Sequence, residues 1–108
     1  MKSVLFAPEV EEDLFELTKI LVDKQYLANA DYAISYVSSL VFYIREHIDS
    51  LPHKNVPYYF SRYGFDAKYI TYKRNSNTTW YIIFEEKANA YLVTHITNNH
   101  VNGQYFNQ

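Results

Sequence analysis

The chain contains no cysteine among its 108 residues. Disulfide bonds, thiol catalysis and zinc sites built on thiolates are therefore excluded. Glycine occurs twice and proline three times, which predicts regular helices and strands joined by short loops. No apolar run reaches the roughly 18 residues that span a bilayer, and the apolar stretch near the start is too short for a secretory signal. From these absences we expect a soluble cytoplasmic protein.

Aromatic side chains, in contrast, are abundant. Twelve Tyr, seven Phe and one Trp account for 19% of the residues, and 48% of the chain is hydrophobic. This composition provides enough apolar surface for a packed core, and a chain of this length fits one such core. We therefore expect a single domain that spans residues 1–108.

Charge is divided unevenly between the two halves, although the formal net charge is only −2. Residues 9–50 hold nine acidic and three basic side chains, whereas residues 52–75 hold five basic side chains and one acidic side chain. Such asymmetry is one sign of contact with a polyanion. Charged residues that simply solvate exposed faces explain the same pattern, and both interpretations stay open for the basic half.

The first half predicts a short strand at residues 2–6 and then two helices. Pro8 suits the first turn of a helix, and the acidic residues that follow it favour the positive end of the helix dipole. Apolar residues at spacings of four, three and four predict a helix over residues 8–25. A second helix is expected from a cap at Asn29 or Asp31 to about Leu51, because Pro52 disfavours helical backbone in the residue before it.

The second half predicts three strands over residues 68–74, 79–86 and 90–97, separated by short polar turns. The middle strand is almost continuously apolar, which is typical of a central strand covered on both faces. Residues 53–63 are expected to form a partly packed loop. Residues 98–108 are expected to form a polar tail that Val101, Tyr105 and Phe106 could anchor. The predicted fold class is α+β, with order βααβββ and a helical hairpin packed on a small, mainly antiparallel sheet.

This order resembles the RelE/ParE superfamily of small bacterial toxins. The segment VLFAPEVEEDL at residues 4–14 is similar to the opening strand and acidic helix start of that family. The segments WYIIF at 80–84 and YLVTHI at 91–96 are similar to its closing hairpin. The resemblance covers nearly the whole chain. It implies the toxin of a type II toxin–antitoxin, or plasmid stabilisation, system, which a cognate antitoxin protein wraps and neutralises.

Two activities divide the family. RelE-like members cut messenger RNA, usually on the ribosome, and ParE-like members inhibit DNA gyrase without cutting nucleic acid. We expect a metal-independent endoribonuclease that binds RNA, needs no cofactor and inhibits translation. A gyrase inhibitor and an inactive protein-binding module of the same fold are the alternatives.

RNA cleavage without a metal needs a base for the 2′-hydroxyl, an acid for the leaving oxygen and donors on the phosphate. In RelE-like enzymes, Lys and Arg on the middle strands and residues near the C-terminus fill these roles, and a His at the end of the chain can titrate near neutral pH. The expected catalytic residues are therefore His100, Tyr105 and Lys73. The expected phosphate or RNA contacts are Arg62, Lys68, Arg74, Asn98 and Asn99.

Each of these residues also has a structural interpretation. Lysines on an edge strand discourage aggregation, a lone His often caps or solvates a surface, and Asn pairs often close turns. His95 is interpreted as a hydrogen-bonded structural residue. His95 and His100 lie five apart with no acidic residue nearby, so we expect no metal site. The aromatic residues around Arg62 suit RNA stacking, a protein interface or core packing.

Overall fold

The computed structural model describes residues 2–23, 30–64 and 66–106. Within these residues helices pack on a five-stranded mixed sheet, which confirms the α+β class. In chain order the elements are β1 (Ser3–Phe6), α1 (Pro8–Asp23), α2 (Ala30–His47), β2 (Lys54–Asn55), the 3₁₀ helix η1 (Tyr58–Tyr63), β3 (Lys68–Asn75), β4 (Thr78–Glu86), β5 (Ala90–Asn98) and α3 (Asn99–Phe106).

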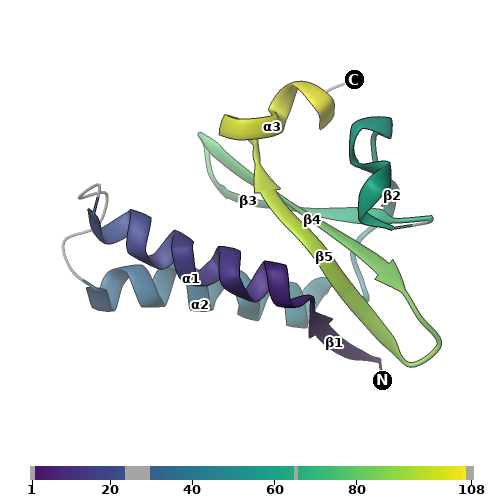
Figure 1. Cartoon of the computed structure of the whole chain (residues 1–108), viewed down its shortest axis with the longest axis horizontal. Coiled ribbons are helices and arrows are strands. Elements are labelled where there is room, and N and C mark those ends of the chain that lie inside the picture. Colours follow the sequence, from purple (N-terminus) through teal and green to yellow (C-terminus); the bar gives the residue numbers. More distant parts are fainter. Residues whose placement is uncertain (1, 24–29, 65, 107–108) are drawn as a thin grey trace.

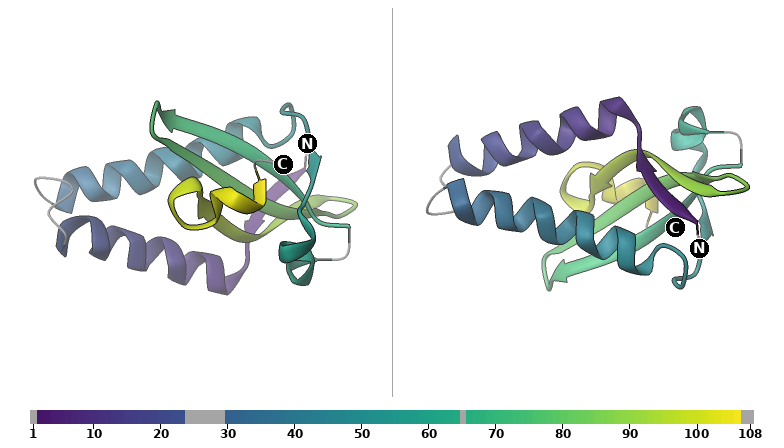
Figure 2. Two further views of the ribbon diagram at one scale, coloured as in Figure 1. Left: turned by 90° about the horizontal axis from the view of Figure 1, so that it is seen from above. Right: turned by 90° about the horizontal axis from the view of Figure 1, so that it is seen from below.

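The strands lie in the order β1-β5-β4-β3-β2. β1 runs parallel to β5, and the other neighbours are antiparallel. Figure 1 shows the α1–α2 hairpin on one side of the sheet and α3 on the other, with the short helix η1 beside β2. Figure 2 shows α1 and α2 lying side by side. The expected helical hairpin on a mainly antiparallel sheet is thus present.

The main core lies between the hairpin and the sheet. Its buried helical residues face the apolar side chains that alternate along the strands, because a strand presents every second residue to one face. Burial of each such side chain stabilises the fold by about 1.5–3 kcal/mol. The Trp80 indole N–H donates to the Tyr36 hydroxyl at 3.2 Å, so its one polar atom is also satisfied. The core includes Val10, Leu40, Ile44, Ile48, Ile70, Trp80, Ile82, Phe84 and Val93.

A second, smaller core covers the opposite face of β4. It is built from Phe60, Ala67, Tyr69, Tyr81 and Ile83. Phe106 of α3 stacks on Tyr81 with ring centroids 4.0 Å apart and planes 4° apart. β4 is therefore buried on both faces, as its continuous apolar run predicted.

Three elements differ from the prediction. The expected loop at residues 53–63 contains β2 and η1, and the expected polar tail contains α3. α2 ends at His47 rather than near Leu51, with a turn after it. Asp31, one of the two predicted caps of the second helix, lies inside the first turn of α2 rather than before it. The other predicted cap, Asn29, lies outside the described residues, as does the predicted end of the first helix at residue 25.

Side-chain chemistry explains why the tail is helical. Asn98 Oδ1 accepts the backbone N–H groups of His100 at 2.9 Å and Val101 at 3.2 Å, which caps the start of α3. At the other end, Tyr105 and Phe106 pack against the second core. These two residues are the anchors that the sequence suggested, whereas the third suggested anchor, Val101, is 65% exposed.

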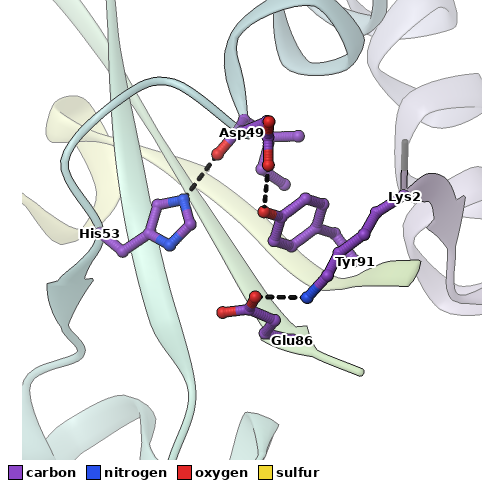
Figure 3. Close-up of polar contacts among 6 residues, drawn as sticks. Lys2, Asp49, His53, Glu86 and Tyr91 are labelled. Atoms are coloured by element: carbon purple, nitrogen blue, oxygen red, sulfur yellow. Dashed lines mark hydrogen bonds and ion pairs between the residues drawn. The ribbon is translucent and has the colours of Figure 1, made fainter. Parts of the chain in front are cut away.

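A polar cluster lies where β4 ends, β5 begins and the turn after α2 meets the sheet (Figure 3). The Tyr91 hydroxyl donates to Asp49 at 2.6 Å, and His53 Nε2 donates at 2.6 Å to a backbone carbonyl of the turn after α2. Lys2 forms an ion pair with Glu86 and lies 4.9 Å from the centre of the Tyr91 ring. The hydrogen bond to Asp49, together with burial, raises the pKa of Tyr91 to about 12. The cluster joins β4, β5 and the residue before β1 to the turn that follows α2.

No helix formed by residues 2–23, 30–64 and 66–106 combines the length and the apolar character needed to cross a membrane.

Candidate functional site

A row of rings with one guanidinium lies on the sheet face that carries η1 and α3. Tyr105 stacks on Tyr59, with ring centroids 3.9 Å apart and planes 8° apart. Arg62 lies 5.0 Å from the centre of the Tyr59 ring and 4.7 Å from that of Tyr63. Tyr63 stacks on His95 at 4.2 Å and 6°. We call these five residues the aromatic stack. It brings together side chains from η1, β5 and α3.

The 3₁₀ geometry of η1 builds the middle of the stack. Residues three apart eclipse one another in such a helix, so Tyr59 and Arg62 lie on one side of it. Phe60 is buried and anchors η1 to the second core. Arg62 Nη1 donates to the Tyr59 carbonyl at 2.8 Å, and Nη2 donates to the Tyr63 hydroxyl at 3.3 Å. These two hydrogen bonds hold an exposed guanidinium in a fixed orientation.

A β-bulge places His95 in the stack. Ile83 pairs with His95 and Phe84 pairs with Val93, so Thr94 is an extra residue opposite the junction of two β4 residues. The extra residue turns the following part of β5 over. Val93 consequently faces the main core, whereas His95 faces η1 and α3.

Charges and burial set the protonation of the stack. Burial lowers the pKa of His95, Asp13 opposes this shift and Arg62 adds to it. His95 is therefore mainly neutral at pH 7 and can accept a proton. The hydrogen bond to Tyr63 is the largest of the effects that raise the pKa of Arg62, which stays positively charged.

Two predicted RNA contacts lie outside the aromatic stack. Lys68, at the start of β3, donates a hydrogen bond to Asn55. Arg74 donates to the Tyr72 hydroxyl at 3.1 Å and lies 4.2 Å from the centre of the Tyr36 ring, so it faces the helical hairpin. The structure places Arg74 on the opposite face of the sheet from the stack.

The polar run at residues 98–100 joins α3 to the turn between β3 and β4. Asn98 caps the helix. Asn99 accepts the Thr79 backbone N–H at 2.9 Å and donates to the Asn77 carbonyl at 3.1 Å. His100 Nε2 forms a 3.0 Å hydrogen bond with the Thr78 hydroxyl. All three side chains therefore have a structural partner.

The expected catalytic residues are not joined by contacts with one another. Lys73 is exposed and pairs across the strands with Thr79, on the same sheet face as α3. Within the described residues its side chain forms no hydrogen bond or ion pair. His100 binds Thr78, and Tyr105 belongs to the stack. Of the predicted site residues, the stack thus unites Arg62 and Tyr105.

The sequence interpretation made His95 a hydrogen-bonded structural residue, whereas in the structure it stacks on Tyr63 and forms no hydrogen bond with the described residues. Strict alternation from Val93 would place it in the main core, and a single chain carries no clear signal for the bulge. Tyr59 and Tyr63 were part of the noted aromatic cluster around Arg62, but η1 was needed to orient them.

An apolar groove runs between α1, the end of β5 and the start of α3. Its volume is about 620 Å³ on the α3 side, and Asp13 and Glu16 flank its other end. Both ends are lined by Leu17, Ile20, Trp80, Asn98 and Val101.

Comparison of the chain with protein-family models, with curated proteins and with solved structures found no match. Across the described ranges no three acidic or histidine side chains gather where they could hold a metal ion. What the site can do chemically follows from its own groups: stacking surfaces, one fixed cation and one neutral imidazole.

Proposed function

We propose that the chain is the cytoplasmic toxin of a type II toxin–antitoxin pair and that it inhibits translation by cleaving messenger RNA without a metal ion. The aromatic stack carries this proposal. The stack combines the exposed ring of Tyr59 and three half-buried rings with an exposed guanidinium. Aromatic rings interleaved with a guanidinium are a usual means of holding single-stranded RNA, whose unstacked bases lie on aromatic faces. The resemblance of the chain to the RelE/ParE superfamily supports the same assignment.

Arg62 suits the phosphate contact. A guanidinium has five N–H donors, and the two internal hydrogen bonds of Arg62 leave three of them for a ligand. Bidentate contact with phosphate oxygens is a geometry that lysine cannot provide. Tyr58, the first residue of η1, is 92% exposed and offers a further ring on the same element.

The apolar groove supports the antitoxin part of the proposal. Ile20 and Val101 are large, exposed side chains in its wall. An antitoxin segment with apolar anchors would fill the groove, and basic flanking residues would complement Asp13 and Glu16. The groove does not include Arg62, which lies in η1, so an antitoxin segment bound in the groove would not contact Arg62 from there.

Cleavage and binding assays test the proposal. A fluorescein-labelled single-stranded RNA is incubated with the purified protein in excess EDTA, and fragments are resolved on a gel. We expect cleavage by the wild type and its loss in Arg62→Ala. Lys19→Ala is the matched control, because it removes one positive charge from α1, on the other side of the sheet.

Two other outcomes would replace the proposal. Inhibition of gyrase supercoiling with intact RNA would assign the chain to the gyrase-directed class. Neither effect, combined with nanomolar binding of a cognate antitoxin, would assign it to an inactive binding module.

A further inference from the structure

We propose that His95 is the general base of this RNA cleavage and that it acts on the 2′-hydroxyl next to a phosphate bound by Arg62. The inference rests on the proposed function and names a catalytic residue for it. The first observation behind it is the bulge at Thr94, which turns His95 away from the main core and into the aromatic stack. Bulges of this kind are frequent beside active sites, where they re-aim a side chain.

The second observation is that the ring nitrogens of His95 form no hydrogen bonds with the described residues, unlike those of two other histidines. His100 Nε2 is bonded to Thr78, and His53 Nε2 donates to a carbonyl. Neither ring nitrogen of His95 has a hydrogen bond within the described residues. Every fully buried side-chain nitrogen or oxygen in the described residues has a hydrogen-bond partner. The His95 nitrogens have no such partner, so they are not fully buried and solvent can reach them. A general base needs such an open nitrogen.

The third observation is the position of the neighbouring groups. The Tyr63 ring lies 4.2 Å from the His95 ring and 4.7 Å from the Arg62 guanidinium, centre to centre. A nucleotide stacked beside Tyr63 would therefore have the His95 imidazole near its ribose, to accept a proton, and the Arg62 guanidinium near its phosphate. Lys73 lies on another strand of the same face.

The chemical step is a transesterification within the RNA. The His95 imidazole takes the proton of the 2′-hydroxyl, the 2′-oxygen bonds to phosphorus, and the bond from phosphorus to the 5′-oxygen breaks. Its electron pair stays on the 5′-oxygen, which takes a proton from water. The water that protonates the 5′-oxygen becomes hydroxide, and the imidazolium gives its proton to that hydroxide. The products are a 2′,3′-cyclic phosphate and a 5′-hydroxyl end.

Tyr63 of η1 stacks on His95, and Arg62 of η1 and Asp13 of α1 act on it electrostatically. Burial outweighs Asp13, so the pKa of His95 lies below its ordinary value of 6.5. The cleavage rate should therefore rise with pH through this lowered pKa and level off near neutral pH.

The test compares pH–rate profiles of the wild type, His95→Gln and the matched control His47→Gln, which changes an exposed histidine in the last turn of α2. We expect His95→Gln to lose about 10²–10⁴-fold in rate and to lose the acid limb of the profile. It should still bind the same RNA sequence made with 2′-O-methyl riboses. His47→Gln should retain both the rate and the acid limb.

A second measurement does not depend on a variant. Proton–carbon NMR of the wild type gives the pKa of His95 directly, and we expect it to match the kinetic acid limb. Cleavage by His95→Gln at the wild-type rate, or a mismatch of these two pKa values, would overturn the role of His95 and leave the proposed function standing. A wild type that binds RNA but never cleaves it would overturn the nuclease itself and the role of His95 with it.

Discussion

Val93 and His95 are two residues apart in one strand, yet their side chains lie on opposite faces of the sheet. Thr94 is the reason, because it has no partner of its own between the pairs Phe84–Val93 and Ile83–His95. Before Thr94, Val93 faces the main core; beyond Thr94, His95 faces the aromatic stack while Ile96 packs against the main core.

Deleting Thr94 should leave the fold in place. The residues on either side would then alternate normally, and His95 would still face the stack. We expect a cost of about 1–3 kcal/mol in the free energy of unfolding, measured by urea titration. Deleting Ile96 is the control, because it turns Thr97 toward the main core and removes an apolar side chain from it. Equal damage from the two deletions would contradict this account of the bulge.

Tyr105 separates a stacking role from a proton-transfer role. Its ring stacks on Tyr59, so we expect Tyr105→Ala to weaken RNA binding by about 1–3 kcal/mol, the usual value of one base–aromatic stack. Tyr105→Phe keeps the ring and should bind and cleave almost as the wild type does. Fluorescence anisotropy and the cleavage gel measure these effects. Loss of cleavage with intact binding in Tyr105→Phe would show instead that the hydroxyl takes part in the chemistry.

Gly64 is required where η1 leads toward β3. Its φ is +156°, a value that residues with a side chain rarely adopt, and an added Cβ would lie 2.6 Å from the carboxyl carbon of Glu85. We expect Gly64→Ala to cost about 1–3 kcal/mol through backbone strain and this clash. Adding Glu85→Ala should recover only the part due to the clash. Thermal unfolding followed by circular dichroism compares the two variants, and a Gly64→Ala protein as stable as the wild type would refute the prediction.

Tyr91 predicts a loss of stability at alkaline pH. Its pKa is raised to about 12 in the folded protein, against about 10 in an unfolded chain. The folded state therefore holds the proton more tightly, so this contribution is complete below pH 10 and is lost as pH rises through 12. Urea unfolding at pH 8 to 12 should show a steeper decline for the wild type than for Tyr91→Phe.

The variant also has a cost at neutral pH. Loss of the hydrogen bond to Asp49 should destabilise Tyr91→Phe by about 1–3 kcal/mol at pH 8. Parallel pH profiles for the two proteins would contradict the assignment of the alkaline loss to Tyr91.

Periodic patterns were the reliable guide to the fold. Spacings of three and four predicted α1, and the apolar run of β4 predicted a strand covered on both faces. α3 was missed because Asn and His are modest helix formers. Its stability comes from the cap at Asn98 and from the packing of Phe106 on Tyr81, which are tertiary contacts.

The candidate site was less predictable than the fold. Arg62 was singled out by its charge among aromatic residues, but the 3₁₀ turn that orients it leaves no periodic signal in six residues. Residues 98–100 were predicted to bind or cleave RNA. In the structure their side chains cap α3 and form hydrogen bonds to the turn between β3 and β4. His95 needed the bulge, which depends on how two strands pair rather than on either strand alone.

The pairing of β1 with β5 has a consequence for how the chain reaches this structure. Ser3 lies opposite Ala90, so β1 can pair only after the ribosome has made β5, more than 80 residues later in the sequence. Closing a loop of that size costs entropy before its contacts repay it, and it slows folding relative to a local hairpin. The β3–β4–β5 meander can assemble from neighbouring segments. We therefore expect β1 to dock late, and a nascent chain released before residue 90 would lack the partner strand of β1.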